Sequence, residues 1–448
     1  MPAVTSFNLG AKIAIETDRG SAPSGVVNGR GWWEGGRWFS IVTEGVPNAR
    51  DMQAVIFPSG HAGDRRMNQQ PPVVGRRWSE AEMSGPVVAD YLGALLYAAM
   101  GAASTDMIPH TTASLLAASI IETNPQSYSL TNQPNEGGAI MRFELKGGAS
   151  NGDVSVSGID VYGNGASEIV HFGSGNTTIY TRTSFSSVGA LGVAVSGVTS
   201  GSITITAIKR FVHTFTNASS SPHLSIEKMG DPQAGNASRS FIYVGQLLRE
   251  LTIENNAGQE DGVMMMSFST VGEPTGGITG TSAQTTIHAP SPLKIWPAWF
   301  MQVSRDGGTY NVVENFSITH STNNRNVFAA ANAQGPQQGL YGSVEATGNM
   351  TIIVENEGEY NRWRGASEMR LHAMWGSGNS NGWKATSVLN YYLNASLPVY
   401  FEDLNLEESD DALMVSGTFR VVRNDSYPYQ FQLGNGTPQK AYGAGTGV

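Results

Sequence analysis

The sequence predicts a mainly β protein built from β-sandwich domains, and three observations support this fold class. Charged residues make up only 14% of the chain, against roughly 25% in a typical globular protein. Glycine is abundant, with 54 residues, and short apolar runs alternate with Gly, Pro, Asn and Asp, as in proteins with many strands and turns. At 448 residues the chain is too long for one ordinary domain and suits two or three. With so few charges, we expect subunit contacts to cover part of its surface.

The N-terminal region predicts short strands at Lys12–Thr17, Trp38–Thr43 and Ala54–Phe57, each bounded by turn-forming residues. Residues 20–37 lie between the first two strands and hold many glycines together with Trp32 and Trp33. We consider two interpretations of this loop. It docks on another subunit or domain, or it is a poorly ordered loop.

One segment, residues 84–104, has a convincing helical period. Its apolar residues recur at three- and four-residue steps, which places them on one helix face: Val88, Tyr91, Leu92, Leu95, Leu96 and Ala99. Pro86 suits the first helical turn, where its missing N–H costs nothing, and Gly101 suits the C-terminal cap. We expect this helix to pack on a sheet.

Residues 135–208 have turn signals every 8 to 12 residues, a spacing typical of a small all-β sandwich. A Gly-Ile-Asp strand, a Gly-Asn-Gly turn and a Ser-Glu-Ile-Val strand resemble the order found in immunoglobulin-like modules. The alternative is that these are added strands of the surrounding domain.

Residues 211–272 read as a strand, a polar loop, a second strand and then two long alternating strands joined by an acidic turn that contains Gly. No catalytic constellation lies among them. Met264, Met265 and Met266 are consecutive and cannot share one strand face, so we expect both faces of that strand to be covered.

Two parts of the chain look like copies of one another. Residues 249–271 and 402–422 both read as strand, acidic turn and strand. Aligned with a two-residue gap in the turn, the matching pairs are Leu251 with Leu404, Ile253 with Leu406, Glu254 with Glu407 and Phe268 with Phe419. Upstream, 53–59 aligns with 316–322 and 82–85 with 345–348 at one common spacing. The order of these matches indicates two copies of one fold, with residues 135–208 inserted into the first.

The sequence carries no strong enzymatic or metal-site motif. Residues 376–386 are rich in Gly, Ser and Asn but lack the Gly-Lys-Ser/Thr of a phosphate loop. The histidines are dispersed; His213 and His223 could meet across strands, although a structural role is the simpler interpretation. Carboxylates cluster at 402–403 and 407–411, where we expect the second cluster to be solvated in a hairpin turn rather than to face an acidic partner across a cleft.

Trp296, Trp299 and Phe300 form an aromatic cluster with two interpretations. They form a sugar-stacking platform, or they bury a linker against a domain or a neighbour. The second is favoured.

Charge and composition exclude further classes. The net charge is −10, whereas a groove that grips nucleic acid needs clustered Lys and Arg; an acidic wall would instead repel DNA. There is no cysteine, so disulfide scaffolds, thiolate zinc sites and cysteine nucleophiles are excluded. The first 20 residues lack the pattern of a secretion signal. The most apolar window, 87–100, is about 14 residues long, short of the roughly 20 that span a bilayer.

The order of elements in 211–272 resembles that of tail tube (major tail) proteins of long-tailed, siphophage-like bacteriophages. In that family a His-Thr-Phe-Thr-like strand precedes a Leu-Ser-Ile-Glu-Lys-like strand, matched here at 213–216 and 224–228, and a hairpin ends in apolar residues followed by Gly. The resemblance implies tandem tail-tube-type β-sandwich domains, each with a flanking helix. Residues 1–134 and 209–280 would form the first, 281–448 the second with a helix near 359–367, and 135–208 an immunoglobulin-like insert.

The resemblance further implies a structural virion protein and not an enzyme, with no cofactor, metal or catalytic residue. Its copies would polymerise as stacked rings around a tape-measure protein, contact other tail proteins, and let DNA pass non-specifically through the lumen. Three two-domain chains would complete a pseudo-sixfold ring; a hexamer of single-tube subunits is the alternative. The protein would be made in the host cytoplasm, without membrane contact, and reside in the virion. The competing hypothesis is a surface or secreted β-sandwich protein that binds carbohydrate or mediates adhesion through Trp296 and Trp299.

Overall fold

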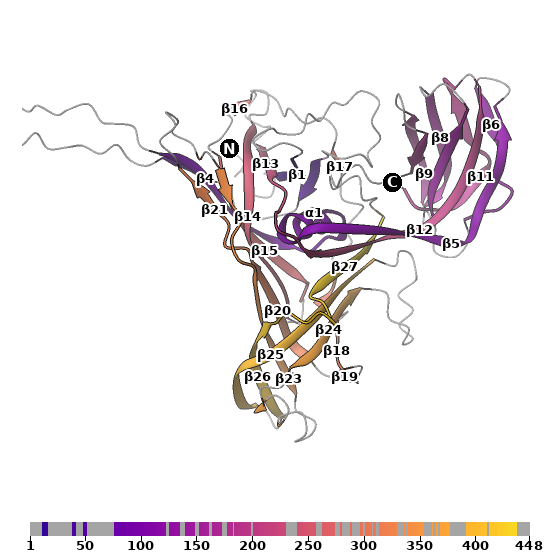
Figure 1. Ribbon diagram of the computed structural model, residues 1–448. Coiled ribbons are helices and arrows are strands. Elements are labelled where there is room, and N and C mark those ends of the chain that lie inside the picture. Colours follow the sequence, from indigo (N-terminus) through magenta and orange to yellow (C-terminus); the bar gives the residue numbers. More distant parts are fainter. Residues whose placement is uncertain are drawn as a thin grey trace, which may run out of the picture.

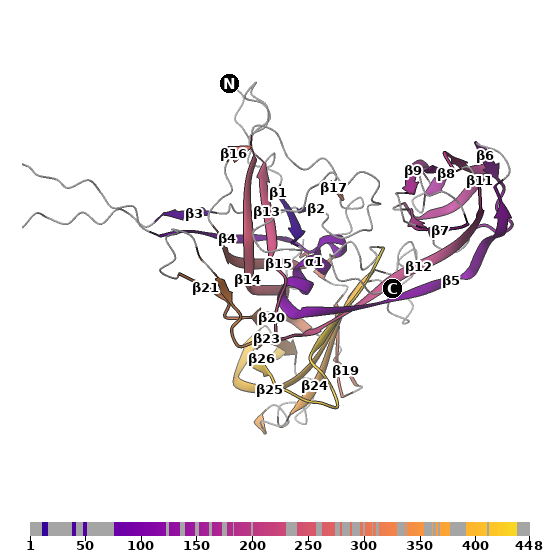
Figure 2. The ribbon, with the colours of Figure 1, turned by 45° about the horizontal axis from the view of Figure 1, so that its top comes forward.

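The computed structural model describes residues 11–16, 38–41, 48–51, 76–121, 125–229, 240–353 and 361–436, with gaps inside the last three ranges, the longest at 377–390. The described chain is mainly β with one helix, which confirms the predicted fold class. It has a central body and a distal unit at the end of a long two-stranded ribbon (Figures 1 and 2).

The first half of the body contains α1 (Ala89–Met100) and the strands β1 (Ala11–Ile15), β2 (Trp38–Ile41), β3 (Asn48–Asp51), β4 (Arg77–Pro86), β13 (Leu224–Met229), β14 (Ser240–Asn256), β15 (Met265–Gly272), β16 (Ile278–Thr279) and β17 (Ile287–His288). The second half contains β18 (Met301–Arg305), β19 (Gly308–Tyr310), β20 (Val313–Ser321), β21 (Arg325–Val327), β22 (Gln338–Leu340), β23 (Glu345–Ile353), β24 (Met369–Gly376), β25 (Tyr392–Ser409), β26 (Ala412–Val421) and β27 (Gln430–Asn435). The ribbon and distal unit contain β5 (Gly101–Ile120), β6 (Gln126–Tyr128), β7 (Ile140–Lys146), β8 (Gly152–Asp160), β9 (Gly165–Phe172), β10 (Thr178–Tyr180), β11 (Phe185–Ser196) and β12 (Ser202–Asn217).

The two halves of the body share one strand-pairing scheme. In the first half the neighbours follow the order β2-β1-β13-β14-β15-β4-β3, and in the second the order β19-β18-β24-β25-β26-β23-β20, with every pair antiparallel. A register shift interrupts β14–β15 at Arg249 and β25–β26 at Glu402. These two residues are also opposite each other in the sequence alignment, so the repeat in the sequence coincides with a repeat in topology, down to the position of the bulge.

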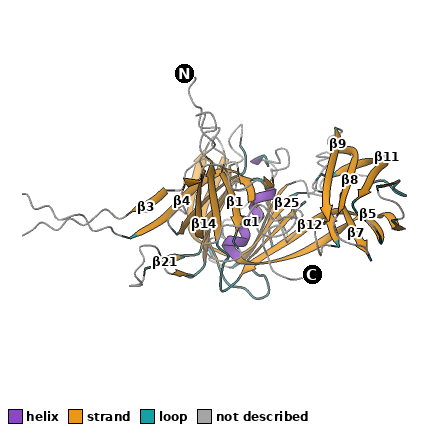
Figure 3. Cartoon of the chain, turned by 90° about the horizontal axis from the view of Figure 1, so that it is seen from above, coloured by secondary structure: helices purple, strands orange, loops and turns teal. Residues whose placement is uncertain are grey.

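The helix α1 is buried on nearly all sides. Tyr91, Leu92, Ala94, Leu95 and Ala98 have 0% exposure, and strands surround the helix when the molecule is seen from above (Figure 3). A helix that is apolar on all sides belongs in a core. The sequence predicted burial of one face only, whereas the structure buries nearly the whole circumference of the helix.

The ends of α1 show what the sequence predicted well and what it did not. Gly101 adopts the left-handed conformation at φ +87° and its N–H bonds the Tyr97 carbonyl, which confirms the predicted cap. Pro86 does not begin the helix; it ends β4, and α1 starts at Ala89 because Val87 still bonds the Met264 carbonyl in sheet fashion (2.9 Å).

The distal unit has a hydrophobic core of its own, formed between the sheet β6-β11-β8-β9 and the strands β10, β7, β12 and β5. This core includes Leu115, Ile121 and Tyr128. The packed unit therefore begins before residue 135, where the sequence placed the insert's start.

Other strand predictions are settled where the residues are described. β1 and β2 confirm the first two N-terminal strands, and β12 to β15 confirm the reading of 211–272. The predicted strand 54–57 and the loop 20–37 lie outside the described residues. So does most of 359–367, but Asn361 and Arg364 are helical and the Gly365 N–H bonds the Asn361 carbonyl (3.0 Å), the bond of an α-helical turn within the predicted segment.

Candidate functional site

The most distinctive surface of the described chain is one face of the sheet that runs β4-β15-β14-β20-β23-β26-β25. Along β4, β20, β23 and β26, and in parts of β14 and β15, buried residues alternate with residues that are not buried, because successive side chains point to opposite faces. The buried side is apolar: Ala81, Met83, Phe268, Leu251, Ile253, Phe316, Ile318, Ala346, Met350, Ile352, Val415 and Phe419 are all at most 4% exposed.

The other side, here called the polar face, consists of Glu80, Glu82, Ser84, Ser267, Ser269, Glu250, Thr252, Glu254, Ser317, Thr319, Ser321, Glu345, Thr347, Asn349, Thr351, Ser416, Thr418, Arg420, Asp403 and Asn405. Strand register aligns these residues into rows. One row joins Ser84 to Ser267, Thr252, Thr319, Thr347 and Arg420 through directly opposed pairs. The two Thr hydroxyls of this row on β14 and β20 are 2.9 Å apart. The polar face is therefore continuous across both halves of the body.

The polar face is acidic. Its charged members are Glu80, Glu82, Glu250, Glu254, Glu345 and Asp403 against Arg420. Arg420 is already engaged, with Nη1 2.9 Å from Glu345 Oε1 and Nε 2.7 Å from Glu402 Oε1. The Glu402 carboxylate, and then Glu345, raise the pKa of Arg420 above its usual range. Among the residues of the polar face named above, no cluster of free cations is available to hold phosphates.

The polar face is also hollowed. An open depression of about 780 Å³ lies over β4, β15 and β14; its lining includes the carboxylates of Glu80, Glu82 and Glu250, the single cation Arg249, and the hydroxyls of Ser84, Ser267, Ser269 and Ser321. Hydroxyl and carboxylate groups in such a surface hydrogen-bond water well, and they repel a polyanion. The arrangement does not suit capture of nucleic acid, which needs clustered Lys and Arg.

The residues that the sequence raised as candidates are dispersed over the structure. His213 is fully buried, with Nδ1 2.8 Å from the Thr105 hydroxyl and Nε2 3.0 Å from Asn435 Oδ1. It thus has a structural hydrogen-bonding role, while the His223 ring contacts the Tyr341 ring. No group of three or more His, Asp or Glu close enough for a metal ion occurs among the described residues.

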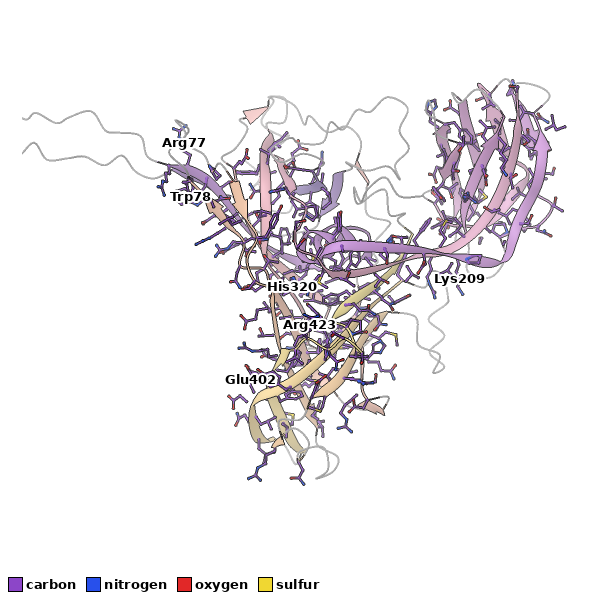
Figure 4. All side chains as sticks on the ribbon, viewed as in Figure 1. Arg77, Trp78, Lys209, His320, Glu402 and Arg423 are labelled. Carbon is purple, nitrogen blue, oxygen red and sulfur yellow. The ribbon has the colours of Figure 1, made fainter. Side chains whose placement is uncertain are left out.

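The carboxylate clusters do not all lie where expected. Glu402 is half-exposed at the margin of the lower sheet (Figure 4) and pairs with Arg420. Glu407 and Glu408 belong to β25, which continues to Ser409, so the predicted turn placement is wrong for these two. Both residues pair with β26, so β25 continues past the position at which the acidic composition suggested a turn.

Four of the aromatic and methionine residues considered in the sequence lie in the described part of the chain, Trp296 and Met264 to Met266. Trp296 is 5% exposed within the main core, and its carbonyl accepts the Met264 N–H (2.9 Å). It buries a linker segment against the sheet, so Trp296 is not part of an open sugar platform; Trp299 and Phe300 lie outside the described residues. Met264 and Met266 are buried and Met265 is half-buried.

The polar face itself was missed at the sequence level. The signal was present as strict alternation of polar and apolar residues in segments such as 80–84 and 315–319, but only strand register shows that these segments form one surface. The helix of the described part, with 12 residues, is too short to cross a bilayer.

Comparison with known families gives one result. Residues 210–425 match the family model described as "Phage tail tube protein". This range begins in β12 and runs past β26, so it takes in most of the strands that form the polar face. No curated protein gives a significant match to the chain.

Proposed function

Because this chain belongs to the phage tail tube family and is a structural phage tail protein, we propose that its copies polymerise as stacked rings. The rings form a hollow tube through which genomic DNA is delivered to the host. The family is structural, so no reaction is assigned to the chain, and its place is the virion. Synthesis in the host cytoplasm precedes assembly.

The observation that carries this proposal is the continuous polar face. A channel wall for DNA must be wetted, must carry few free cations, and must extend without a break around the channel. The polar face meets each need: it is rich in hydroxyls, its charge is acidic, and it spans both halves of the body. We place this face toward the lumen and the apolar face toward the packed core.

The shared pairing scheme of the two halves supports three chains per ring. If each half supplies one equivalent wall segment, three chains supply a pseudo-sixfold wall. A ring of six chains, each supplying one segment, is the alternative. Native mass spectrometry of isolated rings separates the two, and a mass of six chains would contradict the duplicated-domain proposal.

The proposed partners follow from this assembly. The chain contacts further copies of itself, a tape-measure protein and other tail proteins, and DNA passes without sequence preference. The ribbon β5–β12 holds the distal unit away from the body (Figure 1), so we place that unit, the proposed immunoglobulin-like insert, on the outside of the tube. We retain 1–134 with 209–280, and 281–448, as the proposed tube domains and 135–208 as the proposed insert, onto whose core Leu115, Ile121 and Tyr128 of the first domain's sequence pack.

Negative-stain electron microscopy of the purified full chain tests the proposal. We expect hollow striated tubes or flat rings. Uniform globular particles under all conditions that favour assembly would contradict it, and would favour the carbohydrate-binding or adhesion alternative.

A further inference from the structure

The turn between β8 and β9 of the distal unit ends in an Asn-Gly dipeptide, Asn164–Gly165. In such a dipeptide the asparagine amide is open to attack by the next backbone nitrogen, because glycine has no Cβ to hinder the approach. Five Asn-Gly pairs occur in the sequence, and the structure describes both residues of two of them, Asn164–Gly165 and Asn435–Gly436. The two pairs share their local chemistry, so a difference in their reactivity must come from the fold.

Hydrogen bonds at the end of the β8–β9 hairpin set the direction of the Gly165 N–H. The Asp160 N–H donates to the Asn164 carbonyl oxygen (2.8 Å), so these two residues form a hydrogen-bonded pair of the antiparallel ladder. The next pair, Ile159 opposite Gly165, is therefore a non-hydrogen-bonded pair, in which the backbone N–H groups point away from the partner strand. The Gly165 N–H points to the edge of β9 that faces away from β8, and among the described residues β9 is the last strand of its sheet. The β8–β9 ladder thus leaves the Gly165 nitrogen accessible.

The Asn164 side chain is also accessible. Asn164 and Gly165 are both exposed, and a Cβ added at Gly165 would meet no atom within 4 Å. The backbone N–H of Asn164 donates to Asp160 Oδ1 (2.8 Å), whereas its side-chain amide makes no hydrogen bond with the described residues. The amide is therefore able to rotate toward the Gly165 nitrogen.

Asn435 lies in the opposite environment. Its side chain has 0% exposure, its Oδ1 is 3.0 Å from Nε2 of His213, and its Nδ2 donates to the Ala89 carbonyl (3.0 Å). A Cβ added at Gly436 would lie 2.8 Å from the Tyr391 hydroxyl oxygen, so the backbone there is crowded. Rotation of the Asn435 amide toward the Gly436 nitrogen would break two buried hydrogen bonds, which is costly.

We propose that Asn164 is a site of spontaneous deamidation on the distal unit, and that the fold protects Asn435 from the same reaction. The Gly165 nitrogen loses its proton to solvent and attacks the side-chain carbonyl carbon of Asn164. A C–N bond forms, the bond to the amide nitrogen breaks, and that nitrogen takes a proton from solvent and leaves as ammonia. Water then opens the cyclic imide at one of its two carbonyls and yields aspartate or isoaspartate. Water is the only co-reactant.

The product changes both the charge and the backbone of the hairpin. Aspartate or isoaspartate places a new carboxylate next to Asp160, whose own carboxylate accepts the Asn164 N–H, and like charges at short range repel. Isoaspartate also lengthens the main chain by one carbon at the residue that closes the ladder. We therefore expect the Asp160–Asn164 end of the hairpin to loosen. The inference uses the proposed function only for the position of the distal unit, on the outside of the tube, where the surface of ageing virions becomes more acidic.

Peptide mass mapping of the purified, unassembled full chain tests the proposal. During incubation in mildly alkaline buffer, we expect Asn164 to convert from amide to acid at least tenfold faster than Asn435. Both aspartate and isoaspartate should appear at residue 164, because the imide opens on either side. In denaturant the two sites should convert at similar rates. The proposal is wrong if the rates are equal in the folded chain, if Asn435 converts faster, if no isoaspartate forms, or if the tenfold difference persists in denaturant.

The variant Gly165→Ala tests the identity of the attacking nitrogen. The φ of Gly165 lies outside the left-handed region and the added methyl group has room, so we expect the variant to fold as wild type by circular dichroism. The methyl group hinders the neighbouring nitrogen, and conversion of Asn164 should slow several-fold. An unchanged rate would overturn the proposed attack. The assay needs neither rings nor tubes, so failure of the chain to assemble would count against the proposed function and not against this inference.

Discussion

A buried histidine on β20, the strand that pairs with β14 of the first half, should make folding sensitive to acid. His320 on β20 is 2% exposed and lies near the end of α1 (Figure 4). Its Nε2 is 3.1 Å from the Ala99 carbonyl oxygen and its Nδ1 is 3.0 Å from the Tyr429 hydroxyl. Since a carbonyl can only accept, Nε2 carries the proton and Nδ1 accepts from the Tyr429 O–H. The neutral ring satisfies both partners, and a second proton on Nδ1 would break the bond from Tyr429.

Burial lowers the pKa of His320 from 6.5 to about 4, opposed by the hydrogen bond to the Ala99 carbonyl. The unfolded chain therefore takes up this proton at a higher pH than the folded chain does. Stability from His320 is fully present above pH 6.5 and is lost as the pH falls from about 6.5 to about 4. At about 1.4 kcal/mol per pKa unit, the loss is about 3 kcal/mol.

The assay is denaturant unfolding of unassembled wild type and His320→Gln at pH 7 and pH 4. Glutamine can donate to Ala99 and accept from Tyr429 but does not titrate. We expect the free energy of unfolding of wild type to fall by about 3 kcal/mol more than that of His320→Gln over this range, while acid titration of carboxylates affects both proteins equally. An equal pH dependence in the two proteins would refute the reasoning.

Three further predictions concern packing, backbone and the channel wall. Ile253→Ala should lower the free energy of unfolding by about 3 kcal/mol, and Leu406→Ala by less than about 1 kcal/mol in the unassembled chain, because only the first is sealed; equal losses in denaturant unfolding would contradict the difference between the two positions. Gly101→Ala should cost about 2 kcal/mol or more in the same assay, because φ is +87° and the added Cβ would meet the Ser220 carbonyl oxygen; an unchanged transition midpoint would show that the turn relaxes freely. Glu250→Lys, on the polar face, should leave tubes intact but slow DNA release from reconstituted phage several-fold at low salt, with recovery at high salt; Glu250→Gln is the control, and unaltered release in the lysine variant would contradict a lumen-facing position.

Local features of the chain were predictable where local chemistry decides the structure. The αL cap at Gly101 follows from a glycine after an apolar helical run, and β13 to β15 follow from alternation between turn residues. The repeat was also visible, because two strand–turn–strand segments kept matching residues on both sides of the acidic turn.

Long-range pairing decided the rest. The sequence alone determined a mainly β chain, its helix and its repeated segments, since composition, alternation and capping act over a few residues. Only the tertiary structure decided that Pro86 closes a strand, that Glu407 and Glu408 extend β25, and that His320 lies against Ala99 and Tyr429. It alone distinguished Ile253, which is buried, from Leu406, which is aligned with Ile253 in the sequence repeat but is exposed. The physical reason is that burial and register are set by strands distant in sequence, so equivalent residues acquire different roles when their strand neighbours among the described residues differ.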